Sequence, residues 1–308
     1  MRDRPSTPAR CAGLRSGRAG PATALLALAL LAAGAGCRSQ AGKLEEAHTL
    51  RHRGDPKGAL ERYKSILADL GDGPLTGERA SIRGKALKGA GDVSYLELGD
   101  YMGAISYYRR IISLAPGTAD ARAARIAIGD IYRERFKDHR AAIAQYADVA
   151  ASDAPEAPVY QLAVCKAYFE LKDYRQVRTE ARLLLDRWPT HPLAEEAQLL
   201  TAQAWVLDGR SEEALSAFQA LVDRKPRDEM LGRALEGQAH IHAQAARFDR
   251  AIELYERALP IHPNPDAIRT NLAAVQSRRK KAMPDVPGDR ASAFGGERAP
   301  SSGAAVIP

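Results

Sequence analysis

Residues 202–226 read AQAWVLDGRSEEALSAFQALVDRKP, and the same order of small, aromatic and proline residues returns 37 positions earlier and 37 positions later. The recurring sets are Cys165, Ala202 and Ala239; Tyr168, Trp205 and His242; Val177, Ala214 and Ala251; Ala181, Phe218 and Tyr255; Leu184, Leu221 and Ala258; and Pro189, Pro226 and Pro263. Six registers kept together from Val159 to Pro263 indicate an internal repeat, in which each unit is one supersecondary element.

Each repeat is interpreted as two antiparallel helices. The small residue, such as Ala202, lets the first helix approach the second closely. In the second helix Ala214 and Phe218 share a face, because they stand four positions apart. Pro226 then ends the unit, since proline cannot continue a helix interior.

This order resembles the tetratricopeptide repeat, whose usual period is about 34 residues. The resemblance implies an all-α solenoid, a right-handed superhelix of antiparallel helix pairs. The surplus of about three residues falls between each proline and the next small residue, as between Pro189 and Ala202. We expect it to form roughly one extra helical turn.

Looser copies of the pattern precede the regular repeats. Residues 43–70 predict a first repeat. The loop at 71–74 is expected to hold an insertion, because Ala59 and the equivalent residue of the next repeat, Ala104, are 45 positions apart. The second repeat has Asp92 at the position of the small residue. The third has one extra residue in its turn between Arg133 and His139.

The end of the chain departs from the repeat. Residues 264–282 have apolar periodicity for a single helix, which predicts the polar-faced cap that a repeat array needs. Residues 283–308 carry Pro, Gly, Ser and Ala without periodicity and are expected to be disordered. The predicted array, about six repeats and a capping helix, therefore spans residues 43–282.

The N-terminus has the order of an export signal. A basic stretch over residues 1–18 precedes an apolar run of about 15 residues, which is too short to span a bilayer comfortably. Gly34-Ala35-Gly36-Cys37 then resembles the bacterial lipobox, although that pattern prefers leucine where Gly34 stands.

The lipobox resemblance implies that residues 1–36 are removed as a lipoprotein signal peptide and that Cys37 carries a lipid, with residues 37–42 as a short linker. Arg38 follows the cysteine, and in the lipoproteins that this sequence resembles, an arginine there would not signal retention in the inner membrane. The resemblance therefore implies the outer membrane, with the protein facing the periplasm. Two alternatives stay open. One is a plain secretory signal in which Cys37 is incidental, and the other is a cytoplasmic or membrane-anchored protein whose apolar run is not processed.

Charge argues against a nucleic-acid partner. The formal net charge is +7, but the excess lies at the two ends of the chain and the repeats are formally neutral. A nucleic-acid footprint needs basic residues gathered on one face, and the repeats show no such stripe.

Motifs that carry catalysis or bind cofactors are lacking, since the sequence has no phosphate loop, nucleophile elbow, paired Cys-x-x-Cys or His-Glu-x-x-His. His240 and His242 stand two apart on a predicted helix and so face different ways, which makes them poor joint metal ligands. Cys165 is expected to be a buried packing residue. The sequence therefore predicts a protein that is not an enzyme and has no cofactor or metal.

The surface that remains is the concave groove lined by the first helices of successive repeats. Its exposed positions are predicted from the register to be Asp130, Arg133, Lys166, Phe169, Gln203, Val206, Arg233, Glu236 and His240. Such a mixture of polar and apolar residues suits an extended peptide or a partner helix. Phe169 and Arg233 are the expected anchors.

The favoured hypothesis is an envelope lipoprotein whose repeats form an interaction scaffold in a membrane-associated complex. The repeats resemble those of the tetratricopeptide lipoprotein of outer-membrane barrel assembly and of the periplasmic coordinator of the Tol-Pal system. A cytoplasmic regulator or co-chaperone is the alternative. An enzyme with accessory repeats is disfavoured, since no segment is left to house a catalytic domain.

Overall fold

A computed structural model describes residues 40–282, which divide into two compact units with their boundary between Tyr160 and Gln161. The N-terminal unit contains a helix over residues 40–52, α2 (Pro56–Leu70), α3 (Gly77–Leu96), α4 (Tyr101–Leu114), α5 (Ala119–Ile131), the π-helical turn η1 (Tyr132–Phe136) and α6 (His139–Ala150). Helix α7 (Ala157–Glu170) crosses the boundary. The C-terminal unit continues with α8 (Tyr174–Arg187), α9 (Ala194–Leu207), α10 (Ser211–Asp223), α11 (Asp228–Gln244), α12 (Phe248–Ala258) and α13 (Pro265–Ala282).

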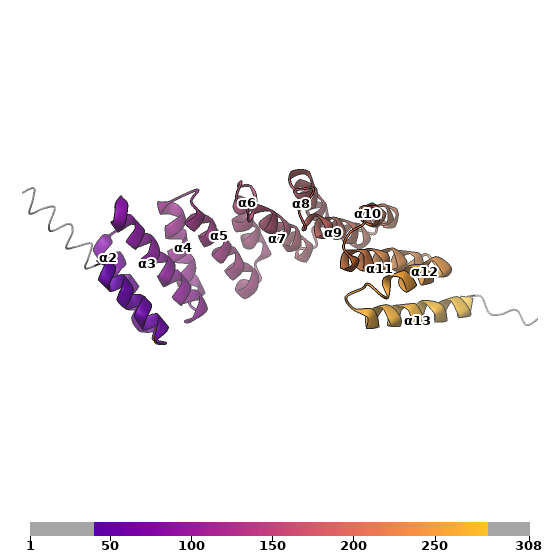
Figure 1. Ribbon diagram of the computed structural model, residues 1–308, viewed down its shortest axis with the longest axis horizontal. Helices are drawn as coiled ribbons and strands as arrows, with labels where there is room; N and C mark the ends of the chain where they lie inside the picture. The colour runs from indigo at the N-terminus through magenta and orange to yellow at the C-terminus, as the bar shows by residue number, and fades with distance from the viewer. Residues whose placement is uncertain (1–39, 283–308) are drawn as a thin grey trace, which may run out of the picture. The chain divides into compact units, whose positions relative to one another are not determined.

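The predicted all-α fold is confirmed for the described residues. Six helix pairs and a final single helix follow one another, and their secondary structure is helix and turn. Each helix packs on the next along the chain within its unit, from α2 on α3 to α5 on α6 and from α8 on α9 to α12 on α13 (Figure 1).

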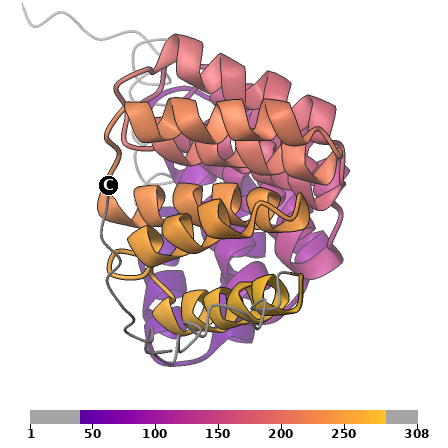
Figure 2. The same ribbon diagram turned by 90° about the vertical axis from the view of Figure 1, so that its right-hand side faces the viewer.

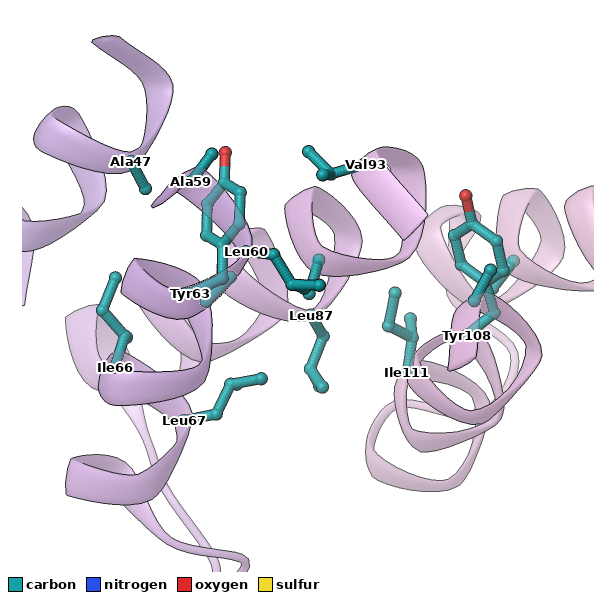
Figure 3. Packing of buried hydrophobic residues seen from close by; sticks show 14 of the residues in the cluster. Ala47, Ala59, Leu60, Tyr63, Ile66, Leu67, Leu87, Val93, Tyr108 and Ile111 are labelled. Atoms are coloured by element: carbon teal, nitrogen blue, oxygen red, sulfur yellow. The ribbon is translucent and has the colours of Figure 1, made fainter. Parts of the chain in front are cut away.

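Alternating small and bulky residues form the core of the N-terminal unit. Ala47, Ala59 and Tyr63 have no exposed surface. Figure 3 shows Leu87 of α3 between the side chains of α2 on one side and Ile111 of α4 on the other. The small residues allow the helices to approach, and the rings and branched side chains fill the space between them.

The C-terminal unit repeats this packing at the sequence positions of the 37-residue period. Ala202 and Ala214 have no exposed surface, and Phe218 fills the space beside them. The last helix, α13, lies along α12 (Figures 1 and 2). It buries Ile268 and Val275 and leaves most of its other residues exposed, so it has the character predicted for a cap.

The second helix of most pairs begins after a tight turn with an i→i+5 backbone hydrogen bond, as from Asp173 N–H to Tyr168 C=O at 3.0 Å. In the first four pairs an aspartate precedes the second helix and accepts a hydrogen bond from a backbone N–H of its first turn; these are Asp55, Asp100, Asp138 and Asp173. This N-cap satisfies a donor that the helix itself leaves unpaired.

The extra residue predicted in the third repeat is present as η1, after which Lys137 adopts a positive φ of 54°. Its turn closes one residue wider, from Asp138 N–H to Tyr132 C=O at 2.9 Å. The second repeat has the same wide turn, from Asp100 N–H to Ser94 C=O at 2.8 Å. A π-type turn is the usual way for a helix to absorb one inserted residue.

That second wide turn corrects the position assigned to Asp92. The position of the small residue is held by Gly91, just as Gly129 holds it in the third repeat. A Cβ atom on Gly91 would lie 2.7 Å from Cε1 of Tyr108, so the tyrosine ring needs the glycine. The register prediction was one residue off because it assumed a turn of ordinary length.

The insertion expected in the loop at 71–74 lies mainly in the helix that follows this loop. The loop is short, and α3 is 20 residues long, so helical turns hold most of the inserted residues. The extra turn expected in each regular repeat is present in α11, which has 17 residues. Before α9, by contrast, the surplus residues form irregular turns between Arg187 and Ala194.

Among the described residues, no helix combines the length and apolar character needed to cross a membrane. The predicted signal peptide and Cys37 lie outside the described residues, as does the segment from Met283 onward. Residues 40–42, predicted to belong to a linker, are already helical.

Candidate functional site

A groove of about 620 Å³ opens in the C-terminal unit. Its lining comes from α7, α9, α10, α11 and the turn before α13, and comprises Phe169, Gln203, Val206, Leu207, Phe218, Arg233, Glu236, Gly237, His240, His262, Pro263 and Asn264. First helices of three successive repeats thus contribute to one surface, as expected of a groove in such an array.

Apolar side chains dominate the α7 and α9 side of the groove. Phe169 is half-buried and meets the Tyr174 ring edge-on, with centroids 5.9 Å apart, which holds its ring in place. Leu207 is 52% exposed. An apolar side chain of this size left in water at a groove is a source of binding free energy, because a ligand that covers it removes that surface from water.

The floor is made where α10 meets α11. Phe218 is 2% exposed and reaches the groove beside Gly237. A Cβ atom on Gly237 would lie only 2.2 Å from Cζ of Phe218, so a larger residue there would displace the ring. The glycine therefore sets the position of the aromatic floor.

Charges at the rim are paired within the chain. Arg233 lies 2.9 Å from Glu229, one helical turn away, and His240 lies 2.9 Å from the amide nitrogen of Gln244. Arg233 is still partly exposed, so its guanidinium can turn toward a ligand. The groove thus combines an apolar floor with adaptable polar groups at its edge.

The far wall is the turn between α12 and α13, held by a nearly buried histidine. Asn264 N–H donates to Nδ1 of His262 at 3.0 Å, and Nε2 of His262 lies 3.1 Å from a carboxylate oxygen of Glu236. Gly232 lets this turn approach α11, since a Cβ there would lie 2.9 Å from the Cα of His262. The wall is therefore fixed by backbone contact and by one side chain.

Six of the nine residues predicted for the groove line this one cavity: Phe169, Gln203, Val206, Arg233, Glu236 and His240. Lys166 does not line it and instead pairs with Glu196 at 2.7 Å. Sequence reasoning missed Leu207, Gly237 and the wall around His262. Only Pro263, the last proline of the period, could have indicated that the chain turns back beside the groove.

Asp130 and Arg133, the other two predicted groove residues, belong to the N-terminal unit and serve its own structure. Asp130 accepts a hydrogen bond from the Tyr146 hydroxyl at 2.7 Å. Arg133 lies 3.3 Å from Asp130 and 2.8 Å from Glu134. Burial, and then the hydrogen bond to Asp130, raises the pKa of Tyr146.

The remaining chemistry-bearing residues are placed as expected. Cys165 is fully buried, and burial raises the pKa of its thiol to about 12, which keeps it protonated and inert at neutral pH. His240 faces the groove, whereas His242 is half-buried on another face, where burial and then Arg247 lower its pKa. Within residues 40–282, no group of three His, Cys, Asp or Glu side chains could hold a metal ion.

Family models described as tetratricopeptide repeat match residues 93–158, 166–229 and 234–266. Together these segments cover more than half of the 308 residues, and they lie between the last turn of α3 and the first turn of α13. The chain belongs to the tetratricopeptide-repeat proteins. Comparison with curated proteins gives no match.

Solved structures resemble this tetratricopeptide-repeat protein at the level of the fold. The apo form of RapI has a TM-score of 0.50 and 14% identity, over 79% of this chain and 72% of its own. A tetratricopeptide repeat protein from Parabacteroides merdae has a TM-score of 0.38 and 13% identity, over 78% and 99%. PilW, described as a type IV pilus biogenesis factor, has a TM-score of 0.43 and 15% identity, over 76% and 98%.

Proposed function

We propose that this protein is a non-enzymatic interaction scaffold and that the groove of its C-terminal unit binds a segment of a partner protein. The observation that carries the proposal is the exposed apolar surface of Leu207 and its neighbours, joined to a fixed floor and a polar rim. A segment that places one bulky apolar side chain on the floor would bury this surface.

The rim favours a partner segment without strong charge. Arg233, Glu236 and His240 each have a polar neighbour in the chain, so none requires an opposite charge from the ligand. Gln203 and Asn264 offer amide groups that can hydrogen-bond an extended backbone. Specificity would then come from the shape of the floor and from these amides.

Removal of groove side chains tests this proposal. Replacing Phe169, Gln203 and Arg233 together by alanine should reduce capture of the partner from envelope extracts, while circular dichroism shows unchanged helicity. Leu183→Ala is the matched control, because this residue of α8 is 45% exposed and does not line the groove. Capture at the wild-type level by the triple variant would reject the groove as the binding site.

We further propose that the scaffold works in the cell envelope, attached to a membrane by a lipid on Cys37 and facing the periplasm from the outer membrane. The support is the order of basic, apolar and small residues that ends at Cys37. Several acyl chains on one cysteine would hold a protein to a bilayer far better than one chain, whose binding is marginal. Assembly or organisation of the envelope is the corresponding role.

Metabolic labelling with palmitate tests the anchor. Cys37→Ser should abolish labelling and release the protein from membranes, and Cys165→Ser is the matched control, since that thiol is buried in the fold. Labelling that persists in Cys37→Ser would reject the lipoprotein proposal. An unprocessed N-terminus, measured by mass spectrometry, would favour the cytoplasmic or membrane-anchored regulator instead.

A further inference from the structure

We propose that the groove is also the docking site for the C-terminal tail of the same chain, residues 283–308, with Phe294 on the floor formed by Phe218 and Gly237. The tail would then compete with the partner segment for one surface. This inference rests on the proposed function in one respect, since it takes the groove as a polypeptide-binding site.

The tail leaves the C-terminal unit within reach of the groove. Residues 262–264 line the groove directly before α13 begins at Pro265. Helix α13 has 18 residues and therefore ends about 26 Å away along its axis. Phe294 follows Ala282 by 12 residues, which span up to about 40 Å when extended. The chain is therefore long enough to return and place this ring on the groove floor.

The composition of the tail fits the chemistry of the groove. Phe294 is the only aromatic residue between Met283 and Pro308, and its neighbours are small, in the order Ala-Ser-Ala-Phe-Gly-Gly. Small neighbours let a backbone lie close to a surface while one ring enters a pocket. The groove needs no charge from its ligand, and this six-residue stretch has none.

Charge on α13 supports a return path along this helix. Its last turn is basic, and within the described residues only Arg279 of this turn has a carboxylate partner, Asp249 at 2.9 Å. Arg278 lies over the Phe248 ring, at 5.3 Å from its centroid. Lys280 and Lys281 are exposed there, and the tail supplies Asp285 and Asp289 directly after them. Opposite charges at the start of the tail would hold it beside α13.

Site-specific photo-crosslinking in the full-length chain tests the proposal. A benzophenone amino acid replaces Leu207, and in a second protein Gln203, so that disturbance of one groove position does not decide the result. Peptide mass spectrometry should find both positions crosslinked to residues 283–308. The same amino acid at position 183, an exposed position of α8 that does not line the groove, gives the background level.

Two sets of variants probe the contacts. Phe294→Ala should lower the crosslink yield about tenfold, because the buried ring supplies most of the binding free energy. Lys280→Glu with Lys281→Glu should lower it about two- to fivefold, the range expected of exposed ion pairs. Val306→Ala, outside the Phe294 stretch, is the control and should have no effect.

Crosslinks to the tail at the background level from both groove positions would overturn the proposal. A mixture of isotopically heavy and light protein distinguishes the source of the tail, and crosslinks found only between heavy and light chains would assign the occupant to a second copy, which also overturns it. Partner capture that still depends on the groove would leave the proposed function standing. Tail crosslinks with unchanged capture by the groove variant would reject the proposed function alone.

Discussion

The second and third repeats, in the N-terminal unit, and the fifth repeat, in the C-terminal unit, use the same repeat position in opposite ways. The residue after the small residue of the first helix is aspartate in the second and third repeats, at Asp92 and Asp130, and is Lys166, Gln203 or His240 in the later ones. Both aspartates accept a hydrogen bond from a tyrosine of their own repeat, Tyr108 at 2.8 Å and Tyr146 at 2.7 Å.

The tyrosines explain the difference. Tyr108 and Tyr146 are almost fully buried, and burial raises the pKa of both hydroxyls, so each remains a donor to its aspartate. At the corresponding position of the fifth repeat stands Phe218, which has no hydroxyl and leaves Gln203 free to line the groove. The second and third repeats thus use this polar position for their own stability, whereas the fifth repeat leaves Gln203 available for a ligand.

Introducing a charge into each core gives the largest expected effect. Ala214→Glu in the C-terminal unit should cost about 4 kcal/mol in free energy of unfolding, because it buries a carboxylate and overpacks a helix contact. Ala142→Glu is the equivalent change in the N-terminal unit, and both alanines have no exposed surface. Glu212→Ala, at a largely exposed side chain, should be nearly neutral.

Hydrogen exchange resolves where each of these changes acts. Ala214→Glu should reduce protection mainly in α9 to α12, and Ala142→Glu mainly in α3 to α6. If either change reduced protection equally in both units, the two units would unfold together. Their difference would then lie in their surfaces and not in their stability.

The next largest effect concerns the glycines that accommodate the rings. Gly129→Ala should cost about 3 kcal/mol and Gly237→Ala about 2 kcal/mol, since a Cβ would lie 2.4 Å from Tyr146 in one case and 2.2 Å from Phe218 in the other. The Tyr146 ring cannot move without losing its bond to Asp130, whereas the Phe218 ring can shift into the groove. Alanine's helix propensity offsets part of each cost. Chemical denaturation measures both, and a larger cost for Gly237→Ala would contradict the proposed difference.

Removal of a single tyrosine hydroxyl should lower the free energy of unfolding in the N-terminal unit more than in the C-terminal unit, by a smaller amount than the changes above. Tyr146→Phe should cost about 1.5 kcal/mol, because the partly buried Asp130 carboxylate loses its shorter hydrogen bond and keeps only that from Arg133 at 3.3 Å. Tyr255→Phe in the C-terminal unit should be close to neutral, since the pKa of this hydroxyl is raised by burial and by the charge of Glu236, with no contribution from a hydrogen bond. Urea denaturation of the two variants at pH 7 provides the comparison. Equal costs would show that the bond to Asp130 adds nothing.

The smallest expected effect is a loss of stability of the C-terminal unit as the pH falls. The pKa of His242 lies below its ordinary value of 6.5, first because of burial and then because of Arg247. A histidine with a lowered pKa contributes its full stability above pH 6.5 and loses it as the pH falls, because the unfolded chain takes up the proton first. The free energy of unfolding should therefore be lower at pH 5 than at pH 7.5. His242→Gln should flatten the profile, and an unchanged profile in that variant would assign the dependence to other groups.

The sequence alone determined the helix pairs, because the small residue, the ring four positions after Ala214 and the closing proline are local requirements of two packed helices. It also determined that Phe169, Gln203, Val206, Arg233, Glu236 and His240 share a face, since that follows from helical register. Turn lengths were harder to predict: the extra residue in the turn of the third repeat was recognised, but the same wide turn in the second repeat was not. The position of Asp92 was therefore misjudged.

Only the tertiary structure decided which of the residues predicted for the groove are open to a ligand. Whether an inward residue such as Asp130 or Gln203 is free depends on whether a side chain from another helix reaches it, and Tyr146 and Phe218 differ there by a single hydroxyl. The groove wall at His262 likewise depends on the approach of a turn to Gly232, far away in sequence. Periodicity specifies which way a residue faces along its own helix. The contacts between helices determine what it meets there.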